Sequence, residues 1–211
     1  MNRLAILGAS GHGKVLADTA ECCGWQAIEF FDDAWPQIES VSEWQVIGDT
    51  ALLKGKLQSY DGVLVAIGNN QVRYHKLLEL VEAGAMIPTM VHPTAIVSRY
   101  ATLEIGSVVF AGAVVNADAR IGMGAILNTG CSVDHDCVLG AGVHVSPGAR
   151  LAGGVRVGDL SWIGIGASVR ELVRIGSQVT VGAGAAVVSD ILDLMTVAGV
   201  PARILPTKGK K

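Results

Sequence analysis

The sequence predicts a small parallel α/β domain over residues 1–91, followed by a β-solenoid of short stacked strands over residues 92–211. Two observations predict this division. Strand-like and helix-like segments alternate in the first part, whereas the second part repeats every six residues between 97 and 186. A chain of 211 residues, of which 50% are hydrophobic, is long enough to bury two cores. A short C-terminal extension ends in the tail Lys208–Lys211, which we expect to be solvated.

The first ninety residues alternate between buried strands and helices. This order is typical of a parallel sheet in which ligands bind at the carboxyl ends of the strands, and we therefore expect a Rossmann-like domain. The predicted helices run from the first glycine turn to about Cys23 and through residues 77–81. The predicted strands are residues 4–7, 27–31, 62–67 and 86–91.

The turns after these strands indicate a nucleotide site. The first turn reads Gly-Ala-Ser-Gly-His-Gly, and its N–H groups from Ser10 to Gly13 would meet a phosphate at a helix N-terminus. The second strand ends in Asp32-Asp33, about where a ribose-binding acid belongs. Val15 stands where a Walker A loop needs Ser or Thr, and the GxxGxG spacing is not that of dinucleotide sites. A mononucleotide or nucleotide-sugar is therefore favoured; the alternative is a tight glycine turn without a ligand.

Fifteen consecutive six-residue blocks run from Val97 to Ala186 within the second part. Each block opens with an aliphatic residue, and its fifth residue is small or short. The fourth residue is Gly in nine of the fifteen, which fits a turn that needs a positive φ. A helix has a period of about 3.6 and an alternating strand a period of 2, so a repeated backbone path explains a period of six better. Three sides of six residues make a triangular coil, and the fifteen blocks give five coils.

This eighteen-residue coil predicts which residues stack on one another. Gly153 is expected one coil above His135, where its N–H would bind a carbonyl oxygen as charge develops. Ile165 and Ala183 are expected one coil apart, forming a smooth strip for a thin, extended ligand. His144 falls near a corner that could bring it to the same cleft as His135.

One cluster in the repeats has the residue types of a catalytic site: His135 stands between Asp134 and Asp136. An adjacent carboxylate raises the basicity of an imidazole and fixes its tautomer, which suits a general base working near neutral pH. Two alternatives stay open. Asp136 fills the fourth position of its block, where Asp tolerates a left-handed turn, and His135 could be a solvated surface histidine.

Composition excludes several classes of function. A net charge of −3 and a pI near 5.9 argue against nucleic acid or an anionic membrane as a partner. No apolar run reaches the roughly 18 residues of a membrane span, and no signal peptide precedes the first strand, so we expect a cytoplasmic protein. Cys131 and Cys137 occupy small inward positions and match no zinc spacing, so we expect core thiols and no metal site.

Taken together, the motifs resemble the NeuD/PglD-like branch of hexapeptide acyltransferases, which includes bacillosamine-pathway and perosamine N-acetyltransferases. The resemblance spans nearly the whole chain and rests on the order of the motifs. They are the Gly-Ala-Ser-Gly-His-Gly turn, Phe-Asp-Asp, Gly-Asn-Asn, His92-Pro93-Thr94-Ala95, Asn128-Thr129-Gly130, Val133-Asp134-His135-Asp136-Cys137, His144-Val145-Ser146-Pro147-Gly148-Ala149 and Gly199-Val200-Pro201-Ala202.

The resemblance implies a left-handed parallel β-helix and a homotrimer with active sites between subunits. Acetyl-CoA would be the co-substrate, with no permanently bound cofactor and no catalytic metal. The acceptor would be the 4-amino group of a nucleotide-linked 4-amino-4,6-dideoxysugar, for bacterial surface glycan or protein glycosylation precursors. A UDP carrier is favoured over GDP, and both remain open. The sequence itself identifies no residue that reads the base. A sialic acid or other sugar O-acetyltransferase is the nearest alternative, and a structural solenoid without activity is another.

The same resemblance assigns roles to residues. His135 would be the general base and Asp136 its support, although several relatives carry Glu at the position of Asp136. The implied acetyl-CoA-binding residues are His144, Gly153, Ile165 and Ala183. The implied substrate-binding residues are Ser10, Gly11, His12, Gly13, Asp32, Asp33, Gly68 and Asn128.

Overall fold

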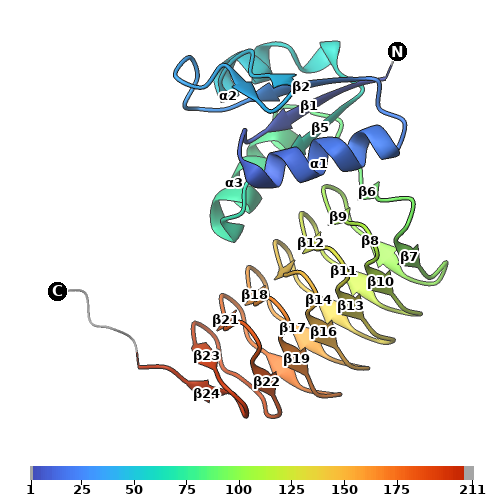
Figure 1. The fold of residues 1–211 in the computed structure, drawn as a ribbon, viewed down its shortest axis with the longest axis vertical. Helices are drawn as coiled ribbons and strands as arrows, with labels where there is room; N and C mark the ends of the chain where they lie inside the picture. The colour runs from blue at the N-terminus through green and yellow to red at the C-terminus, as the bar shows by residue number, and fades with distance from the viewer. Residues whose placement is uncertain (1, 207–211) are drawn as a thin grey trace. The chain divides into compact units, whose positions relative to one another are not determined.

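The computed structural model describes residues 2–206, so the expected tail Lys208–Lys211 lies outside the described residues. The chain divides into two compact units, the first ending at Pro93 and the second beginning at Thr94. Both units have the predicted fold class, a parallel α/β domain followed by a solenoid of stacked strands (Figure 1).

The first unit is built on a parallel three-stranded sheet in the order β2–β1–β5, with β1 at its centre. Its core is apolar and includes the fully buried Leu4, Ile6 and Phe30. The strands of this unit are β1 (Arg3–Leu7), β2 (Ala27–Phe31), the hairpin β3 (Ser40–Val41) and β4 (Trp44–Gln45), β5 (Gly62–Val65) and β6 (Met90–Val91). The helices are α1 (Gly11–Cys22), α2 (Thr50–Gly55), α3 (Asn70–Glu82) and a 3₁₀ turn over Leu57–Ser59.

Side-chain caps fix where two of these helices begin. Asp49 accepts a hydrogen bond from the backbone N of Leu52 at 2.8 Å, and Asn69 accepts one from the N of Val72 at 3.0 Å. Each cap satisfies an N–H that the first helical turn leaves without an intrahelical partner. Because Asn69 follows directly on the turn after β5, its cap sets where α3 starts relative to the carboxyl ends of the strands.

The predicted fourth strand over residues 86–91 is confirmed only at its end, where β6 (Met90–Val91) forms, and residues 86–89 are not a strand. The carbonyl of Met86 accepts a hydrogen bond from the N of Val63 in β5, but the chain does not continue as a strand from there. Pro88 has no N–H to donate to a ladder, which explains why pairing stops. Strand geometry resumes only at β6, outside the three-stranded sheet.

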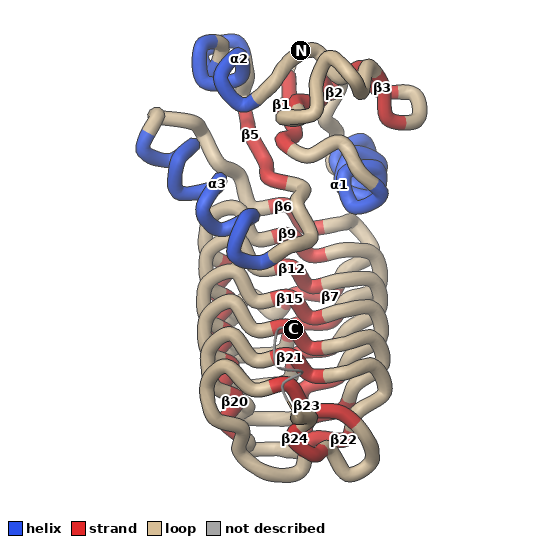
Figure 2. The backbone as a smooth tube through the Cα atoms, turned by 90° about the vertical axis from the view of Figure 1, so that its left-hand side faces the viewer, coloured by secondary structure: helices blue, strands red, loops and turns tan. Residues whose placement is uncertain are grey.

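In the second unit, strands two or three residues long stack in three columns (Figure 2). The β7 face comprises β7 (Ile96–Val97), β10 (Val114–Val115), β13 (Ser132–Val133), β16 (Arg150–Leu151), β19 (Ser168–Val169) and β22 (Ala186–Val187). The β8 face comprises β8 (Thr102–Leu103), β11 (Arg120–Ile121), β14 (Val138–Leu139), β17 (Arg156–Val157) and β20 (Arg174–Ile175). The β9 face comprises β9 (Val108–Val109), β12 (Ile126–Leu127), β15 (His144–Val145), β18 (Trp162–Ile163), β21 (Thr180–Val181), β23 (Thr196–Ala198) and β24 (Arg203–Ile204).

The register of the solenoid confirms the eighteen-residue coil. Val115 pairs with Val133, and Val133 with Leu151, each eighteen residues along the chain. These opening residues of the blocks are buried, as are the short fifth-position residues Cys131 and Cys137. The backbone N–H and C=O groups of each strand therefore bond to the coils above and below, while the aliphatic side chains form the core.

The fourth position of the blocks has the predicted positive φ. All nine glycines there adopt it, with φ between 63° and 70°. Five other residues do so too: Asp118, Asp136, Leu160, Leu172 and Gln178. The turn is therefore imposed by the repeat as a whole, and glycine is its least strained occupant, not its requirement.

The solenoid continues past residue 186 into a shorter coil. Val169 still pairs with Val187, eighteen residues on, but Ile175 bridges Ile191 and Val181 pairs with Val197, each only sixteen residues on. The side chain of Asp190 accepts a hydrogen bond from the N of Arg174 at 2.8 Å and so helps to close this shorter turn. The strict six-residue period therefore predicts five coils and misses this last, shorter one.

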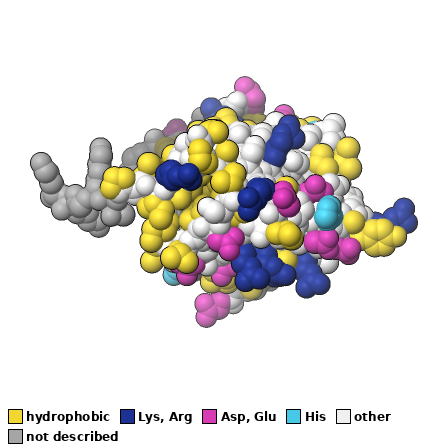
Figure 3. Space-filling view, turned by 90° about the horizontal axis from the view of Figure 1, so that it is seen from below, with side chains coloured by type: hydrophobic (Ala, Val, Ile, Leu, Met, Phe, Trp, Pro, Cys, Tyr) yellow, Lys and Arg dark blue, Asp and Glu magenta, His cyan; other side chains and the backbone are white. Residues whose placement is uncertain are grey.

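Outward-facing side chains of the solenoid are mixed in type. Figure 3 shows Lys and Arg side chains across the middle of one face, among Asp and Glu, with hydrophobic side chains gathered on one side. Among the helices of residues 2–206, none has both the length and the apolar character that crossing a bilayer requires.

Candidate active site

The turn that carries His135 joins β13 to β14, at the corner between the β7 face and the β8 face. Asp134 fixes this turn, because its Oδ1 accepts hydrogen bonds from the N of His135 and from the Nδ2 of Asn116 one coil away, both at 2.8 Å. Asp136 follows with a φ of 60°, the left-handed conformation of the repeat. The corner therefore presents the imidazole outward while its backbone is held on both sides.

Asp136 holds the imidazole of His135 in one orientation. Its Oδ2 lies 2.7 Å from the Nδ1 of His135. A carboxylate can only accept, so Nδ1 carries the hydrogen and Nε2 keeps its lone pair. The hydrogen bond to Asp136 is the main cause that raises the pKa of His135 above its ordinary value of 6.5. Desolvation opposes it, and the charges of Asp134 and Asp136 add to it.

Gly153 lies against this imidazole, as the eighteen-residue register predicts. A Cβ added to Gly153 would come 2.6 Å from both Cε1 and Nε2 of His135, so only glycine leaves this space. The N of Gly154 donates to the carbonyl of His135 at 2.8 Å, whereas the N–H of Gly153 makes no hydrogen bond within residues 2–206. The imidazole of His135 thus lies close to Gly153, a residue whose backbone N–H is available to a ligand.

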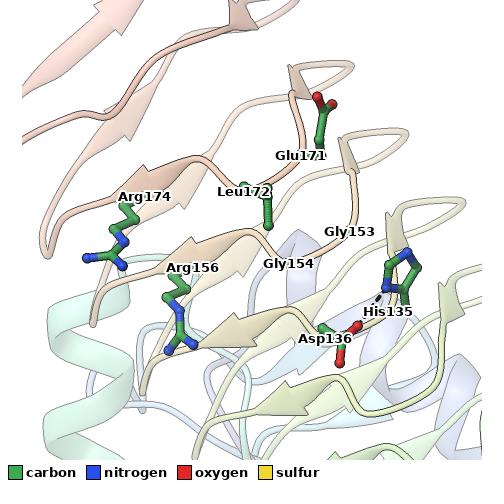
Figure 4. A pocket seen from close by; sticks show the side chains of 8 residues that line it. All are labelled: His135, Asp136, Gly153, Gly154, Arg156, Glu171, Leu172 and Arg174. Carbon is green, nitrogen blue, oxygen red and sulfur yellow. Dashed lines mark hydrogen bonds and ion pairs between the residues drawn. The ribbon is translucent and has the colours of Figure 1, made fainter.

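His135 and Gly153 line a pocket of about 690 Å³ at this corner (Figure 4). Leu172, which is 74% exposed, lies over Gly154 and forms the apolar part of the pocket. The remaining lining residues are Asp136, Arg156, Glu171 and Arg174. The pocket therefore offers a base, a backbone donor, apolar surface and charged groups to one ligand.

His144 is part of a second cluster, on the β9 face. It is buried and stacks on Trp162, with ring centroids 5.0 Å apart and planes inclined by 18°. Trp162 donates from Nε1 to the Oγ of Ser146 at 2.6 Å, and the Nδ2 of Asn128 lies 3.2 Å from the Nε2 of His144. These contacts hold the two rings in place as one wall of a groove.

That groove has a volume of about 460 Å³ and also contains Ile165 and Ala183. Ile165 is 57% exposed, and the N of Gly184 donates to its carbonyl at 2.8 Å, so the two positions lie on successive coils as predicted. The groove shares no lining residue with the pocket of His135. The expectation that His144 joins the cleft of His135 is therefore wrong within one chain.

His144 and His135 line different pockets because the coil has a triangular section with three separate corners. His144 begins a strand on the β9 face, and the groove continues to the corner between the β9 and β7 faces. His135 lies at the next corner, between the β7 and β8 faces. Asn128, expected at the substrate, lies with His144 and not with His135.

A third pocket, of about 320 Å³, lies in the first unit at the carboxyl ends of β1, β2 and β5. It contains the predicted residues Ser10, Asp32, Asp33 and Gly68. Ser10 stands at the N-terminus of α1, where the first helical N–H groups and the helix dipole favour an anion. The pocket therefore suits a phosphate next to hydrogen-bond acceptors.

The two aspartates of this pocket are already hydrogen-bonded within the domain. Asp32 accepts from the N of Ala9 at 2.8 Å and from the N of Ala34 at 2.9 Å, which ties the end of β2 to the glycine turn. Asp33 accepts from the N of Thr50 at 3.0 Å and from the Nζ of Lys76 at 2.9 Å. Bonds to Thr50 and then Lys76 lower the pKa of Asp33 to about 2, against a smaller opposing effect of burial, so it stays ionised at neutral pH.

Gly11, His12 and Gly13 do not line this pocket. A Cβ on Gly13 would collide with the carbonyl oxygen of Gly8 and the ring of Phe30, so Gly13 lets the turn pack closely. Burial, and then the nearby charge of Arg73, lower the pKa of His12 to about 4, so it is neutral at pH 7.

Sequence reasoning missed several residues of these sites. Lys76 lines the pocket at the carboxyl ends of β1, β2 and β5. The sequence could have indicated this, because Lys76 follows the Asn69 cap by seven residues and so lies on the same face of α3. Buried Arg73, on that face too, donates to the carbonyls of Ile67 and Gly68 at 3.0 and 3.2 Å and so shapes the turn before α3. Arg156 and Arg174 are eighteen residues apart, so the repeat could also have predicted that they stack on adjacent coils.

No group of three or more His, Cys, Asp or Glu side chains within residues 2–206 has the arrangement of a metal site.

The α/β domain and the solenoid both match known proteins. Residues 3–80 match the PglD N-terminal domain. The acetyltransferase domain of PglB from Neisseria gonorrhoeae FA1090, solved in complex with acetyl coenzyme A, is 46% identical with a TM-score of 0.93, over 97% of this chain and 100% of that one. PerB from Caulobacter crescentus, solved with CoA and GDP-perosamine, is 38% identical with a TM-score of 0.93, over 98% of both chains.

A curated protein is similar over part of its length. UDP-N-acetylbacillosamine N-acetyltransferase of Bacillus subtilis (strain 168) is 39% identical over 113 residues. This match spans 53% of the present chain and 52% of the relative, about half the length of each. The solved relatives, by contrast, are similar along nearly the whole chain. The chain belongs to the PglD/NeuD-like family of hexapeptide-repeat sugar acetyltransferases.

Proposed function

We propose that this protein transfers the acetyl group of acetyl-CoA to the 4-amino group of a nucleotide-linked 4-amino-4,6-dideoxysugar, with His135 as general base. The observation that carries this proposal is the juxtaposition of His135 and Gly153, with Asp136 on the far side of the imidazole. The acetyl coenzyme A in the PglB structure and the GDP-perosamine in the PerB structure support the two substrate classes.

The proposed reaction follows from the two groups at the corner. As the amine attacks the thioester carbonyl, a C–N bond forms and the Nε2 of His135 takes the proton of the amine. The N–H of Gly153 donates to the carbonyl oxygen, which becomes an oxyanion in the tetrahedral intermediate. When the C–S bond breaks, the imidazolium returns the proton to the thiolate of coenzyme A. Asp136 favours the imidazolium that forms between these steps.

We propose that the active protein is a homotrimer with each site formed by two subunits. The corner of His135 and the groove of Ile165 and Ala183 line separate pockets in one chain. A cyclic trimer repeats one heterologous contact, in which different faces of neighbouring subunits meet. Such a contact would set the base of one subunit beside the acetyl-CoA groove of the next, with His144 and Asn128 on the groove side.

The pocket at the carboxyl ends of β1, β2 and β5 is our proposed site for the nucleotide. Ser10 and the first turn of α1 would hold a phosphate, and Asp32 and Asp33 keep lone pairs for ribose or base. A UDP carrier is the first expectation, supported by the name of the Bacillus subtilis relative, whereas PerB was solved with GDP-perosamine. Lys76, beside Asp33, adds a positive charge to this pocket.

The test of the proposed function is release of free coenzyme A thiol from acetyl-CoA in the presence of a defined acceptor. We expect release with a UDP-linked 4-amino-4,6-dideoxysugar. The GDP-linked sugar tests the carrier, and a free sialic acid tests acylation of a hydroxyl. Release with sialic acid alone would replace N-acetylation by O-acetylation, and binding of neither acetyl-CoA nor a sugar nucleotide would leave a structural solenoid.

The pH dependence of kcat/KM should report the link between Asp136 and His135. His135 acts as a base only when neutral, so kcat/KM should fall as pH drops below its pKa, which lies above the ordinary value of 6.5. Asp136→Asn removes the main cause of that raised pKa, so the acidic limb should move to lower pH. Profiles recorded between about pH 5 and pH 9 would measure this shift.

Asn suits this test because it also tolerates the left-handed φ of 60° at this position. Asp134→Asn is the matched control. Asp134 acts on His135 only through its charge and the backbone, so the shift of the limb should be smaller. An unmoved limb in Asp136→Asn would show that another group controls the profile.

Mixing two inactive variants should test the shared site. His135→Ala disables the corner and Ile165→Glu disables the groove, so each alone should be inactive. In trimers assembled from equal amounts of both, about a quarter of the contacts would join an intact corner to an intact groove, which predicts about a quarter of wild-type activity. Mixtures that stay inactive, although native mass spectrometry shows mixed trimers, would place the whole site within one chain.

A further inference from the structure

Two arginines on the β8 face lie one above the other beside the corner of His135. Arg156 begins β17 and Arg174 begins β20, and the two residues are direct partners in the parallel register. Adjacent strands are about 4.8 Å apart, so the two side chains leave the sheet at that spacing. Both are exposed and both line the pocket that contains His135 and Gly153.

No carboxylate within residues 2–206 is in ion-pair contact with either arginine, although Asp136 and Glu171 line the same pocket. Neither guanidinium forms an ion pair there, and Asp190 meets Arg174 only through the backbone N. In Figure 4 both guanidinium groups point to the same side, whereas the carboxylate of Glu171 points away beyond Leu172. Like charges side by side on a sheet are destabilising, and an anion bound between them would relieve that repulsion.

We infer that Arg156 and Arg174 form a binding site for a phosphate group of one of the two substrates. This inference rests on the proposed function, because both the nucleotide-sugar and coenzyme A carry a diphosphate. Guanidinium groups bind phosphate oxygens through paired N–H donors, and two of them match a diphosphate. Leu172 lies between the arginines and His135, so the part of the ligand that crosses from the phosphate to the reacting centre would pass over an apolar side chain.

Arg120 provides a matched control within the same column. It begins β11 on the β8 face, is also exposed and pairs with Val138, which in turn pairs with Arg156. It forms no ion pair within residues 2–206 and does not line the pocket. Arg120→Gln therefore removes the same charge from the same face, two coils from Arg156, without touching the site.

The experiment is calorimetric binding of coenzyme A, UDP and GDP, each measured separately, to the full-length protein and to Arg156→Gln, Arg174→Gln and Arg120→Gln. Each pocket variant should lose at least about tenfold in affinity for one probe, the expected effect of a lost hydrogen bond to a charged group. Loss confined to coenzyme A assigns the site to the acetyl donor, and loss confined to UDP or GDP assigns it to the acceptor. Arg120→Gln should bind all three like wild type.

Three results would overturn the inference: unchanged affinity for every probe in the pocket variants, the same loss in Arg120→Gln, or a changed oligomeric state by light scattering in the pocket variants alone. The last result would make the arginines subunit contacts. Acetyl transfer by the wild-type protein is measured in parallel. Wild-type transfer with unchanged binding in the variants overturns only this inference, whereas lost binding without any wild-type transfer overturns only the proposed function.

Discussion

His135→Ala should lower kcat/KM for acetyl transfer by at least about 10²-fold, because a positioned general base contributes about 10² to 10⁴. The side chain is exposed and its removal leaves the buried columns intact, so the protein should fold as wild type does. The measurement is release of coenzyme A thiol at saturating acetyl-CoA, with the melting temperature as a check on folding.

His75→Ala is the control for this prediction. His75 is an exposed histidine on α3 that also lies beside a carboxylate, that of Glu79, but it lines none of the three pockets. It should keep wild-type activity. A His135→Ala variant that retains most of its kcat/KM would mean that the amine attacks without a base, and it would remove His135 from the proposed mechanism.

Gly153→Ala should reduce kcat/KM by about 10²-fold, the loss that a displacement of about 1 Å causes at a reacting centre. The added Cβ would come 2.6 Å from Cε1 and Nε2 of His135, so the imidazole must move away from the backbone N–H beside it. Both halves of the proposed catalytic pair would remain present but would no longer face one ligand.

The solenoid itself should tolerate this change. Gly153 does not have a positive φ, and alanine already occupies the same position of its block at residues 111, 117, 141 and 183. The melting temperature should therefore stay close to that of wild type. Lost activity with unchanged melting supports the catalytic geometry, whereas full activity would show that His135 and Gly153 do not act as a pair.

The spacing of residues was enough to predict most of the solenoid. A strict period of six fixes which side chains face inward and which residues stack, so Gly153 could be placed against His135 without coordinates. The register failed at the last coil, where a pairing offset of sixteen residues replaces eighteen. A single repeat period does not predict such a change, and the side chain of Asp190 contributes one of the hydrogen bonds that close the shorter coil.

The sites were less predictable than the fold, because contacts between side chains from different coils and helices determine how the site residues are arranged. The stack of Trp162 on His144 joins residues eighteen apart whose types the repeat does not restrict. Likewise, Asp33 is held by Thr50 and Lys76, which come from two different helices. Sequence proximity placed His144 near His135, but the corner between their strands separates them.

The uniform coil also makes the solenoid a molecular ruler. Each coil advances the chain by one strand spacing, about 4.8 Å, whatever side chains it displays. Inserting or deleting one whole coil of eighteen residues would keep the aliphatic columns continuous and move every later outward residue by that fixed step. Proteins built this way can change the reach between a base and a distant anchoring group in discrete increments, with no redesign of the core.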